Sequence, residues 1–241
     1  MLRHVLLGVG CMLAFSLPKE PETAGLNKEA TFVSRITTEY VYLDREGGEV
    51  EGITEGTAFP FKVEKSGKVN KVYLLTAAHN LNIQNVERVS GFKIEFFAKK
   101  VGKNWVLDSK TTFVLKNVTV LKKDVEKDYA ILTGTTTHYV CPSRLSTKSP
   151  KYMQEVVAVG CAIGIPPAVT EGLVSRESAT MSGRWLSSSQ VIYGNSGGPV
   201  YDKNTGEVIG ITTGILFIQD GWTTIPITHL HLFLPISSVE L

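Results

Sequence analysis

A chain of 241 residues in which 43% of the side chains are hydrophobic is long enough to bury a substantial core, as one or two domains. Its 25 Lys and Arg residues against 23 Asp and Glu leave a formal net charge of +2, which gives no electrostatic basis for binding nucleic acid. Its 22 glycines and 10 prolines, together with many short runs of Val, Ile, Thr, Tyr and Phe, favour an all-β protein over a helical one.

The first segment of the chain has the layout of a secretory signal peptide. The basic start MLRH is followed by the apolar run VLLGVGCMLAFSL and then by the polar, proline-broken PKEPETAG. The apolar run is too short to span a bilayer comfortably, and Ala14 and Ser16 are small enough for a cleavage site. We therefore expect residues 1–16 to be a signal peptide and residues 17–30 to be disordered or extended. A lipid anchor on Cys11, an uncleaved anchor and a buried N-terminal segment are the alternatives.

From about residue 31 the sequence predicts around a dozen short strands separated by turns such as EKSGKVNK. Because no βαβ spacing occurs among them, the pattern favours antiparallel barrels or a sandwich. Helices are predicted only for AAHNLNIQ and for the C-terminal ISSVEL, and the loop-like THYVCPSRLSTKSPKY connects two halves near residues 140–150. Cys141 and Cys161 either pair in an oxidising compartment or remain buried thiols.

The stretch VIYGNSGGPV, residues 191–200, places one serine among three glycines. A surface hairpin is one interpretation, because clusters of Asn and Gly form turns in many proteins. The other is a nucleophile turn, in which Gly194 and Gly197 make room for Ser196 to meet a carbonyl while backbone N–H groups point at its oxygen.

A serine nucleophile needs a histidine base that a third group orients. His79 ends the segment VYLLTAAH, where a buried strand breaks into small residues, although a histidine that caps a short helix would look the same. Asp128 directly precedes the apolar strand YAIL, whereas Asp124 and Glu126 lie in a charged turn. We therefore predict that Asp128, rather than a carboxylate of that turn, holds the tautomer of His79.

In this order, TAAH, DYAIL and GNSGGP resemble the active-site motifs of the chymotrypsin-fold serine peptidases. AVGCAIGIPPAVTEGLVS followed by GNSGGPVYDKNTGEVIGI is most similar to the bacterial HtrA group, and the resemblance extends from about residue 50 to the C-terminus. It implies an all-β fold of two six-stranded antiparallel barrels with the active site in the cleft between them. Residues 31–241 would form the protease domain, with one barrel ending near residue 140 and the other spanning about 150–241.

The resemblance further implies a secreted or periplasmic serine endopeptidase that acts on protein or peptide substrates, without a metal or organic cofactor and without a stable membrane span. The expected catalytic residues are His79, Asp128 and Ser196, and the expected oxyanion hole is formed by Gly194, Asn195 and Ser196. A binding or chaperone-like protein that has lost turnover is the alternative, and an esterase is disfavoured because the strand–turn–helix context of its serine motif is missing.

Two departures from the family pattern affect regulation. HtrA proteins carry a peptide-binding PDZ domain after the protease, and we expect none here because the sequence ends at Leu241, just after its last strand. Asn195 stands where zymogen-activated relatives have an aspartate, so we expect no ion pair with a newly cut N-terminus.

The resemblance also places the pocket for the residue before the cleaved bond among the segments SQVIYG, ITTG and THLHLFL. None of them contains Asp or Glu, so we do not expect cleavage after Arg or Lys. Two alternatives remain: Leu230 at the base would favour small aliphatic residues, or His229 or His231 with a threonine would receive glutamate. A slip of one residue in the strand would exchange the two. The predicted substrate-binding residues are Gln190, Thr212, Thr213, Gly214, Leu230 and His231.

Overall fold

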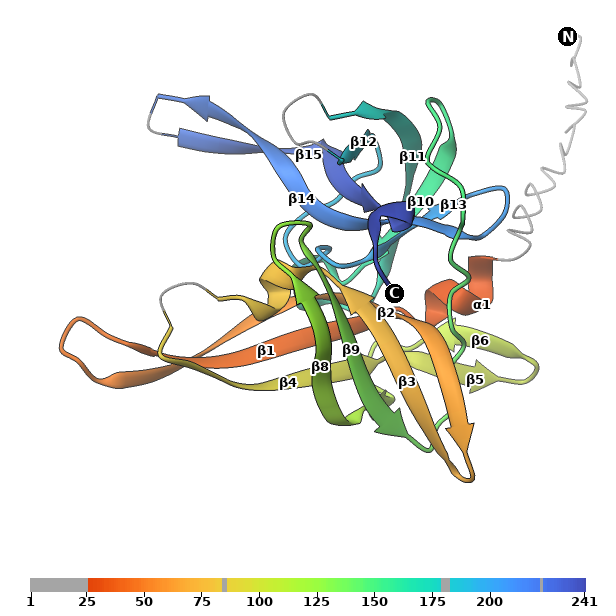
Figure 1. Ribbon diagram of the computed structural model, residues 1–241, viewed down its shortest axis with the longest axis horizontal. Coiled ribbons are helices and arrows are strands. Elements are labelled where there is room, and N and C mark those ends of the chain that lie inside the picture. Colours follow the sequence, from red (N-terminus) through yellow and green to blue (C-terminus); the bar gives the residue numbers. More distant parts are fainter. Residues whose placement is uncertain (1–25, 84–85, 179–182, 222) are drawn as a thin grey trace, which may run out of the picture.

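The computed structural model describes residues 26–83, 86–178, 183–221 and 223–241, which form two β units packed against each other (Figure 1). The predicted signal peptide, residues 1–16, lies outside the described residues, as does most of the segment 17–30. No helix of the described part is long and apolar enough to cross a membrane.

The N-terminal unit is an antiparallel sheet of seven strands in the order β7-β4-β1-β2-β3-β9-β8. The sheet is thus one strand larger than the predicted six, because the two-residue β7 adds to the edge of β4. A separate hairpin, β5 with β6, follows β4. The bounds are β1 Ser34–Leu43, β2 Glu49–Ser66, β3 Val69–Thr76, β4 Arg88–Phe96, β5 Ala98–Val101, β6 Asn104–Leu107, β7 Phe113–Val114, β8 Lys116–Asp124 and β9 Tyr129–Thr136.

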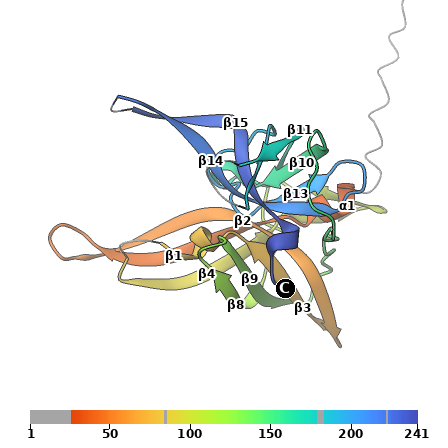
Figure 2. The same ribbon diagram turned by 45° about the horizontal axis from the view of Figure 1, so that its top comes forward.

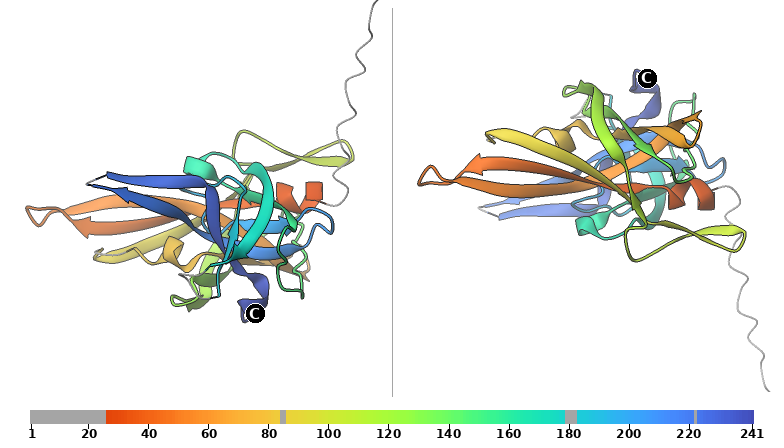
Figure 3. Two further views of the ribbon diagram at one scale, coloured as in Figure 1. Left: turned by 90° about the horizontal axis from the view of Figure 1, so that it is seen from above. Right: turned by 90° about the horizontal axis from the view of Figure 1, so that it is seen from below.

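The C-terminal unit is a closed barrel of six strands in the order β10-β11-β12-β15-β14-β13, which confirms the prediction for this half. Closure removes the unpaired sheet edges that would otherwise expose backbone N–H and C=O groups. The bounds are β10 Glu155–Gly160, β11 Ala168–Glu177, β12 Trp185–Ser187, β13 Pro199–Asp202, β14 Val208–Asp220 and β15 Thr223–Pro235. The hairpins β1–β2 and β14–β15 extend from the body of the molecule in the same direction (Figures 2 and 3).

A hydrophobic cluster shared by the two units fixes how they sit together. Phe59, Leu75 and Tyr129 come from the N-terminal sheet, and Tyr201 and Ile211 come from the barrel; all five are fully buried. Burying aromatic and branched side chains is favourable by roughly 2 kcal/mol each, so this cluster resists relative movement of the units. Each unit also has a cluster of its own.

Four short helices complete the fold: α1 (Leu26–Thr31) and the 3₁₀ turns η1 (Ala78–Leu81), η2 (Ala162–Gly164) and η3 (Ile236–Ser238). The helices predicted in AAHNLNIQ and ISSVEL are therefore single 3₁₀ turns. The expectation of disorder or extension is wrong for residues 26–30, because α1 consists mainly of good helix formers and packs against β6.

Cys141 and Cys161 are both free and buried, and burial raises the pKa of the Cys161 thiol to about 12.

Candidate active site

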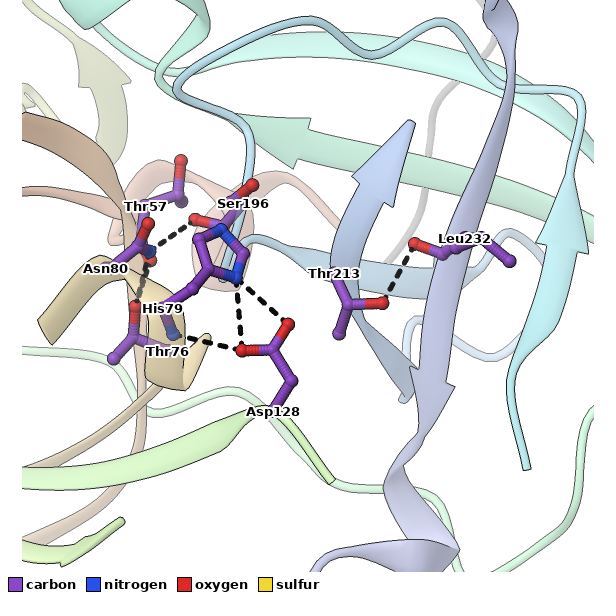
Figure 4. Close-up of polar contacts among 8 residues, drawn as sticks. All are labelled: Thr57, Thr76, His79, Asn80, Asp128, Ser196, Thr213 and Leu232. Carbon is purple, nitrogen blue, oxygen red and sulfur yellow. Dashed lines mark hydrogen bonds and ion pairs between the residues drawn. The ribbon is translucent and has the colours of Figure 1, made fainter. Parts of the chain in front are cut away.

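The sequence TAAH brings His79 to the surface at the point where β3 ends. Ala77 and Ala78 are fully buried, and η1 then turns the chain so that the His79 side chain is 45% exposed. Its Nδ1 lies 3.0 Å and 2.9 Å from the two carboxylate oxygens of Asp128, and its backbone N–H donates to Asp128 Oδ1 at 3.0 Å (Figure 4). This bidentate contact leaves Nε2 as the ring nitrogen that faces outward.

Asp128 occupies the last position before β9, with a backbone φ of +59°. Aspartate tolerates this left-handed conformation better than most side chains. The turn directs a carboxylate that is only 15% exposed toward His79. Asp124, the neighbouring candidate, instead accepts a hydrogen bond from the Lys127 N–H at 2.8 Å within its own turn. The structure therefore brings Asp128, and not Asp124, to the histidine.

Ser196 lies in the loop before β13, on the other β unit, and its side chain is beside the His79 imidazole in Figure 4. The Ser196 carbonyl accepts two hydrogen bonds from the N-terminal unit, from the Thr57 N–H and from the Asn80 side-chain amide, each at 2.8 Å. Among the described residues, no hydrogen bond joins Ser196 Oγ to His79 Nε2. Such contacts are often long without substrate and tighten when it binds.

Thr57, Thr76 and Asn80 form a polar clamp that the sequence analysis did not identify. The Thr57 hydroxyl donates to the Gly194 carbonyl at 2.7 Å and accepts from the Cys161 N–H at 2.8 Å. The Thr76 hydroxyl donates to the Thr57 carbonyl at 2.7 Å and accepts from the Asn80 amide at 3.0 Å. Their only sequence signal is position, because Thr76 is the first residue of TAAH, Asn80 follows that motif, and Thr57 follows a glycine in mid-strand.

The glycines of GNSGGP are required by close backbone approaches. Gly194 has a φ of +92° and Gly197 a φ of +87°. A Cβ on Gly194 would lie 2.3 Å from the Cys161 carbonyl oxygen, and one on Gly197 would lie 2.2 Å from that of Thr57. A larger residue at Gly197 would therefore push the serine loop away from the N-terminal unit, and one at Gly194 would push it away from the segment that follows β10 in its own unit.

The backbone N–H groups of Gly194 and Ser196 have no hydrogen-bond acceptor in the described part of the chain, so both are free to bind an external oxygen atom. The Asn195 N–H, in contrast, donates to the Ile192 carbonyl at 3.1 Å. The expectation that Asn195 contributes to the oxyanion hole is thus wrong, because its N–H is used to close the turn. Its side chain is 4% exposed, and Oδ1 has no partner among the described residues.

The residues expected to line the specificity pocket differ in their burial and in their contacts. Gln190 is exposed, and its carbonyl accepts from the Thr170 hydroxyl. Gly214 and Leu230 are half-buried. Thr212 is occupied by backbone bonds to the serine loop, to Gly197 and Gly198, and Thr213 donates weakly to the Leu232 carbonyl at 3.4 Å.

The register of β15 turns His231 inward and leaves His229 exposed. His231 pairs with Ser187 of β12 and with Ile215 of β14, and its side chain is fully buried. The ring Nδ1 lies 3.0 Å from the Ser189 carbonyl oxygen, and Nε2 has no partner in the described residues. Burial lowers the pKa of His231 to about 4, so its ring is neutral at pH 7.

Among the described residues, no three His, Cys, Asp or Glu side chains lie close enough to hold a metal ion.

The first testable prediction concerns the clamp. We expect Thr57→Val to lower the free energy of unfolding by about 2–4 kcal/mol, because the Gly194 carbonyl and the Cys161 N–H both lose their partner. Thr133→Val is the matched control: its buried hydroxyl donates only to the Val72 carbonyl, so we expect a loss of about 1 kcal/mol. Urea unfolding monitored by tryptophan fluorescence measures both. Equal losses in the two variants would contradict the clamp.

Comparison with known proteins places the chain among the peptidases. No curated protein matches it. The solved structures that are similar in fold include the HtrA-type protease AlgW with a decapeptide and a serine-to-alanine variant of it with a decapeptide. Both are 17% identical to this chain, with TM-scores of 0.60 and 0.62 respectively, over 87% and 86% of this chain.

The matched part spans 62% and 61% of those two chains, so this chain corresponds to about three fifths of their length. At this identity the likeness confirms the expected chymotrypsin-like fold. The model of the trypsin-like peptidase domain matches residues 56–211, which is more than half of the sequence. The chain therefore belongs to the trypsin-like peptidase domain family.

Proposed function

We propose that this protein is a serine endopeptidase that hydrolyses peptide bonds through Ser196, His79 and Asp128. The observation that carries the proposal is the paired contact of His79 Nδ1 with both carboxylate oxygens of Asp128, at 3.0 Å and 2.9 Å, beside a serine loop held from across the cleft. Both similar solved structures are of a protease with a decapeptide, which supports a peptide as the substrate of this protein.

In the proposed mechanism, Asp128 accepts the Nδ1–H of His79 and so presents the Nε2 lone pair to Ser196. Nε2 takes the proton of Ser196 Oγ as the oxygen attacks the substrate carbonyl, and then gives it to the leaving amine. The acyl-enzyme that remains is hydrolysed by a water molecule, which His79 deprotonates in the same way.

The free N–H groups of Gly194 and Ser196 would stabilise the negative oxygen of the tetrahedral intermediate. Each such donor is worth roughly 3 kcal/mol of transition-state stabilisation in comparable sites. The hydroxyl of Thr57 acts indirectly, because its hydrogen bond to the Gly194 carbonyl orients the peptide group at that turn.

The alternative function is a binding protein with the same fold but no turnover. The presence of all three side chains argues against it, because loss of turnover usually follows damage to the triad. A fluorophosphonate probe distinguishes the two functions, since only an activated serine reacts with it. Labelling at Ser196 that disappears on heat denaturation supports the peptidase, and absence of labelling in folded protein supports the binding protein.

We predict that Ser196→Ala abolishes hydrolysis of an unfolded protein substrate while leaving the fold intact, because only the nucleophile is removed. His79→Ala should fall to a similar residual rate, since members of a triad act as a unit. Cleavage by the purified protein, with product ends mapped by mass spectrometry, measures both. If the serine variant retained most of the activity, the assignment would fail.

We further predict that Asp128→Asn slows turnover by about four orders of magnitude, because it favours the wrong tautomer of His79. Asp124→Asn is the matched control, since its carboxylate bonds only within its own turn and its loss should leave turnover almost unchanged. Steady-state kcat values for the two variants test the choice, and the reverse ranking would identify Asp124 as the working acid.

We also propose that the protein acts outside the cytoplasm, on the basis of the basic start and short apolar run in residues 1–16. N-terminal sequencing of protein from its native host should then begin after residue 16. Intact Met1 in a cytosolic fraction would contradict export.

A further inference from the structure

We propose that Arg35, held by Glu95, is a positioning residue of this peptidase. Through the turn η2 it fixes the direction of the Gly194 N–H, one of the two donors proposed for the oxyanion hole. The inference rests on the proposed peptidase function and deepens it, because it names a residue outside the triad, on the other β unit from the serine loop, that keeps the oxyanion hole in its working geometry.

The first step is the register of the N-terminal sheet. Arg35 on β1 pairs with Glu95 on β4 and with Thr57 on β2, so the three residues form one row across the strands. Directly opposed residues of an antiparallel sheet lie on the same face. Thr57 reaches the serine loop from this face, where its hydroxyl donates to the Gly194 carbonyl at 2.7 Å. Arg35 therefore stands on the face of the sheet that contacts the site.

The second step is the use of the Arg35 guanidinium. Its Nε and Nη2 donate to one carboxylate oxygen of Glu95, at 3.0 Å and 2.8 Å, and its Nη1 donates to the Gly164 carbonyl of η2 at 2.5 Å. Nη1 also lies 3.4 Å from Glu55 Oε1. Because a guanidinium holds its donors in a rigid planar fork, the two bonds to Glu95 set the direction of the bond to Gly164.

The Glu95 carboxylate is a charged anchor for this fork. Its side chain is only 5% exposed. Burial raises the pKa of Glu95, but hydrogen bonds from Lys93, Arg35 and Thr111 outweigh burial and lower the pKa below its usual value. Glu95 is therefore ionised at pH 7, and its hydrogen bonds with Arg35 are charge-assisted and largely shielded from water.

The third step leads from η2 to the oxyanion hole. The N–H of Ile163, the residue before Gly164, donates to the Tyr193 carbonyl at 2.7 Å. That carbonyl and the Gly194 N–H belong to one peptide group, whose planar trans geometry makes them point in opposite directions. The bond from Ile163 therefore turns the Gly194 N–H away from η2, where it has no acceptor among the described residues.

Ile163 needs support from outside its own turn. Its backbone φ is +46°, a left-handed conformation that is unfavourable for a β-branched residue. Such a residue keeps this conformation only where its surroundings enforce it. Its neighbour in η2, Gly164, carries the carbonyl that Arg35 binds. Without that bond, we expect the turn to relax and the Ile163 N–H to release the Tyr193 carbonyl.

Thr57 and Arg35 hold successive peptide groups of the serine loop. Thr57 binds the Gly194 carbonyl, which belongs to the peptide group between Gly194 and Asn195. Arg35 acts through η2 on the preceding group, between Tyr193 and Gly194. Because the Gly194 N–H lies in that preceding group, the Thr57 contact alone does not fix its direction.

The kinetic test compares Arg35→Met with Arg88→Met on a peptide that contains a mapped cleavage site. Methionine has no donors, and Arg88 is the matched control because it also pairs with a glutamate, Glu49, but on the exposed surface. We expect Arg35→Met to lower kcat by about tenfold to a hundredfold and to change KM by less than about twofold, since an oxyanion-hole donor acts in the transition state. Arg88→Met should leave both unchanged. Equal kcat values in the two variants, or a change in KM alone, would overturn the proposal.

Two further variants separate the fork from the charge and from folding. Arg35→Lys keeps the positive charge but loses the fork, so we expect its kcat to fall nearly as far as that of Arg35→Met. Because Arg35→Met leaves the buried Glu95 carboxylate with fewer partners, it could fail to fold. The double variant Arg35→Met/Glu95→Gln removes that charge and should show the same loss of kcat. Wild-type kcat in Arg35→Lys or in the double variant would refute the positioning role.

A measurement without catalysis keeps this proposal separate from the proposed function. Amide hydrogen exchange, followed by NMR in the Ser196→Ala background, reports directly on the Ile163 N–H. We expect Arg35→Met to speed exchange of this amide by at least about tenfold, and Arg88→Met to leave it unchanged. Faster exchange in a protein that hydrolyses no peptide supports the hold of Arg35 on the loop, and only the peptidase function fails. Equal exchange at Ile163 in the two variants would overturn the role of Arg35 even in an active enzyme.

Discussion

The site depends on a small number of hydrogen bonds that cross between the two β units. Thr57, in the middle of β2, donates its N–H to the Ser196 carbonyl and its hydroxyl to the Gly194 carbonyl. One residue of the N-terminal unit thus binds two peptide groups of the C-terminal unit. The side-chain amide of Asn80, the residue after His79, donates a second hydrogen bond to the Ser196 carbonyl. These donors and acceptors are largely buried, so water cannot replace a partner that is lost. Distorting the geometry of these hydrogen bonds is therefore costly.

The same constraint explains the glycines that surround the serine. The loop can approach Thr57 only if no Cβ intervenes, and Gly197 is the residue that meets the Thr57 carbonyl. Gly194 has a positive φ, and in this turn the Asn195 N–H donates to the Ile192 carbonyl. The N–H groups on either side, those of Gly194 and Ser196, have no acceptor among the described residues. The hydrophobic cluster beneath, with Phe59 and Leu75 facing Tyr201, holds both units at the separation that these bonds require.

His79 and His231 have opposite environments, and this difference gives them different chemistry. The first is half-exposed, and its Nδ1 contacts both carboxylate oxygens of Asp128. The second is fully buried, its Nδ1 donates to the Ser189 carbonyl, and burial lowers its pKa to about 4, so its ring is neutral at pH 7.

Local sequence determined the parts of this protein that depend on residue type and order. Alternating strands predicted an all-β fold, and the segments TAAH, DYAIL and GNSGGP located His79, Asp128 and Ser196, because small residues, a carboxylate before an apolar strand and dense glycines each limit the conformations available to their own segment. Asp128 could be chosen over Asp124 for the same reason, since only Asp128 directly adjoins a buried strand.

Tertiary structure decided what depends on contacts between distant segments. Thr57 has an ordinary strand sequence around it, and only the packing of β2 against the serine loop makes it part of the site. The register of β15 buries His231 and leaves Leu230 half-buried, because neighbouring strand residues face opposite sides and nothing local distinguishes the two registers. The Asn195 N–H, in contrast, closes a local turn onto Ile192 that the sequence analysis did not foresee. Residues 26–30 have helix-forming side chains of their own, but β6, the partner that they pack against, is distant in the sequence and is supplied only by the fold.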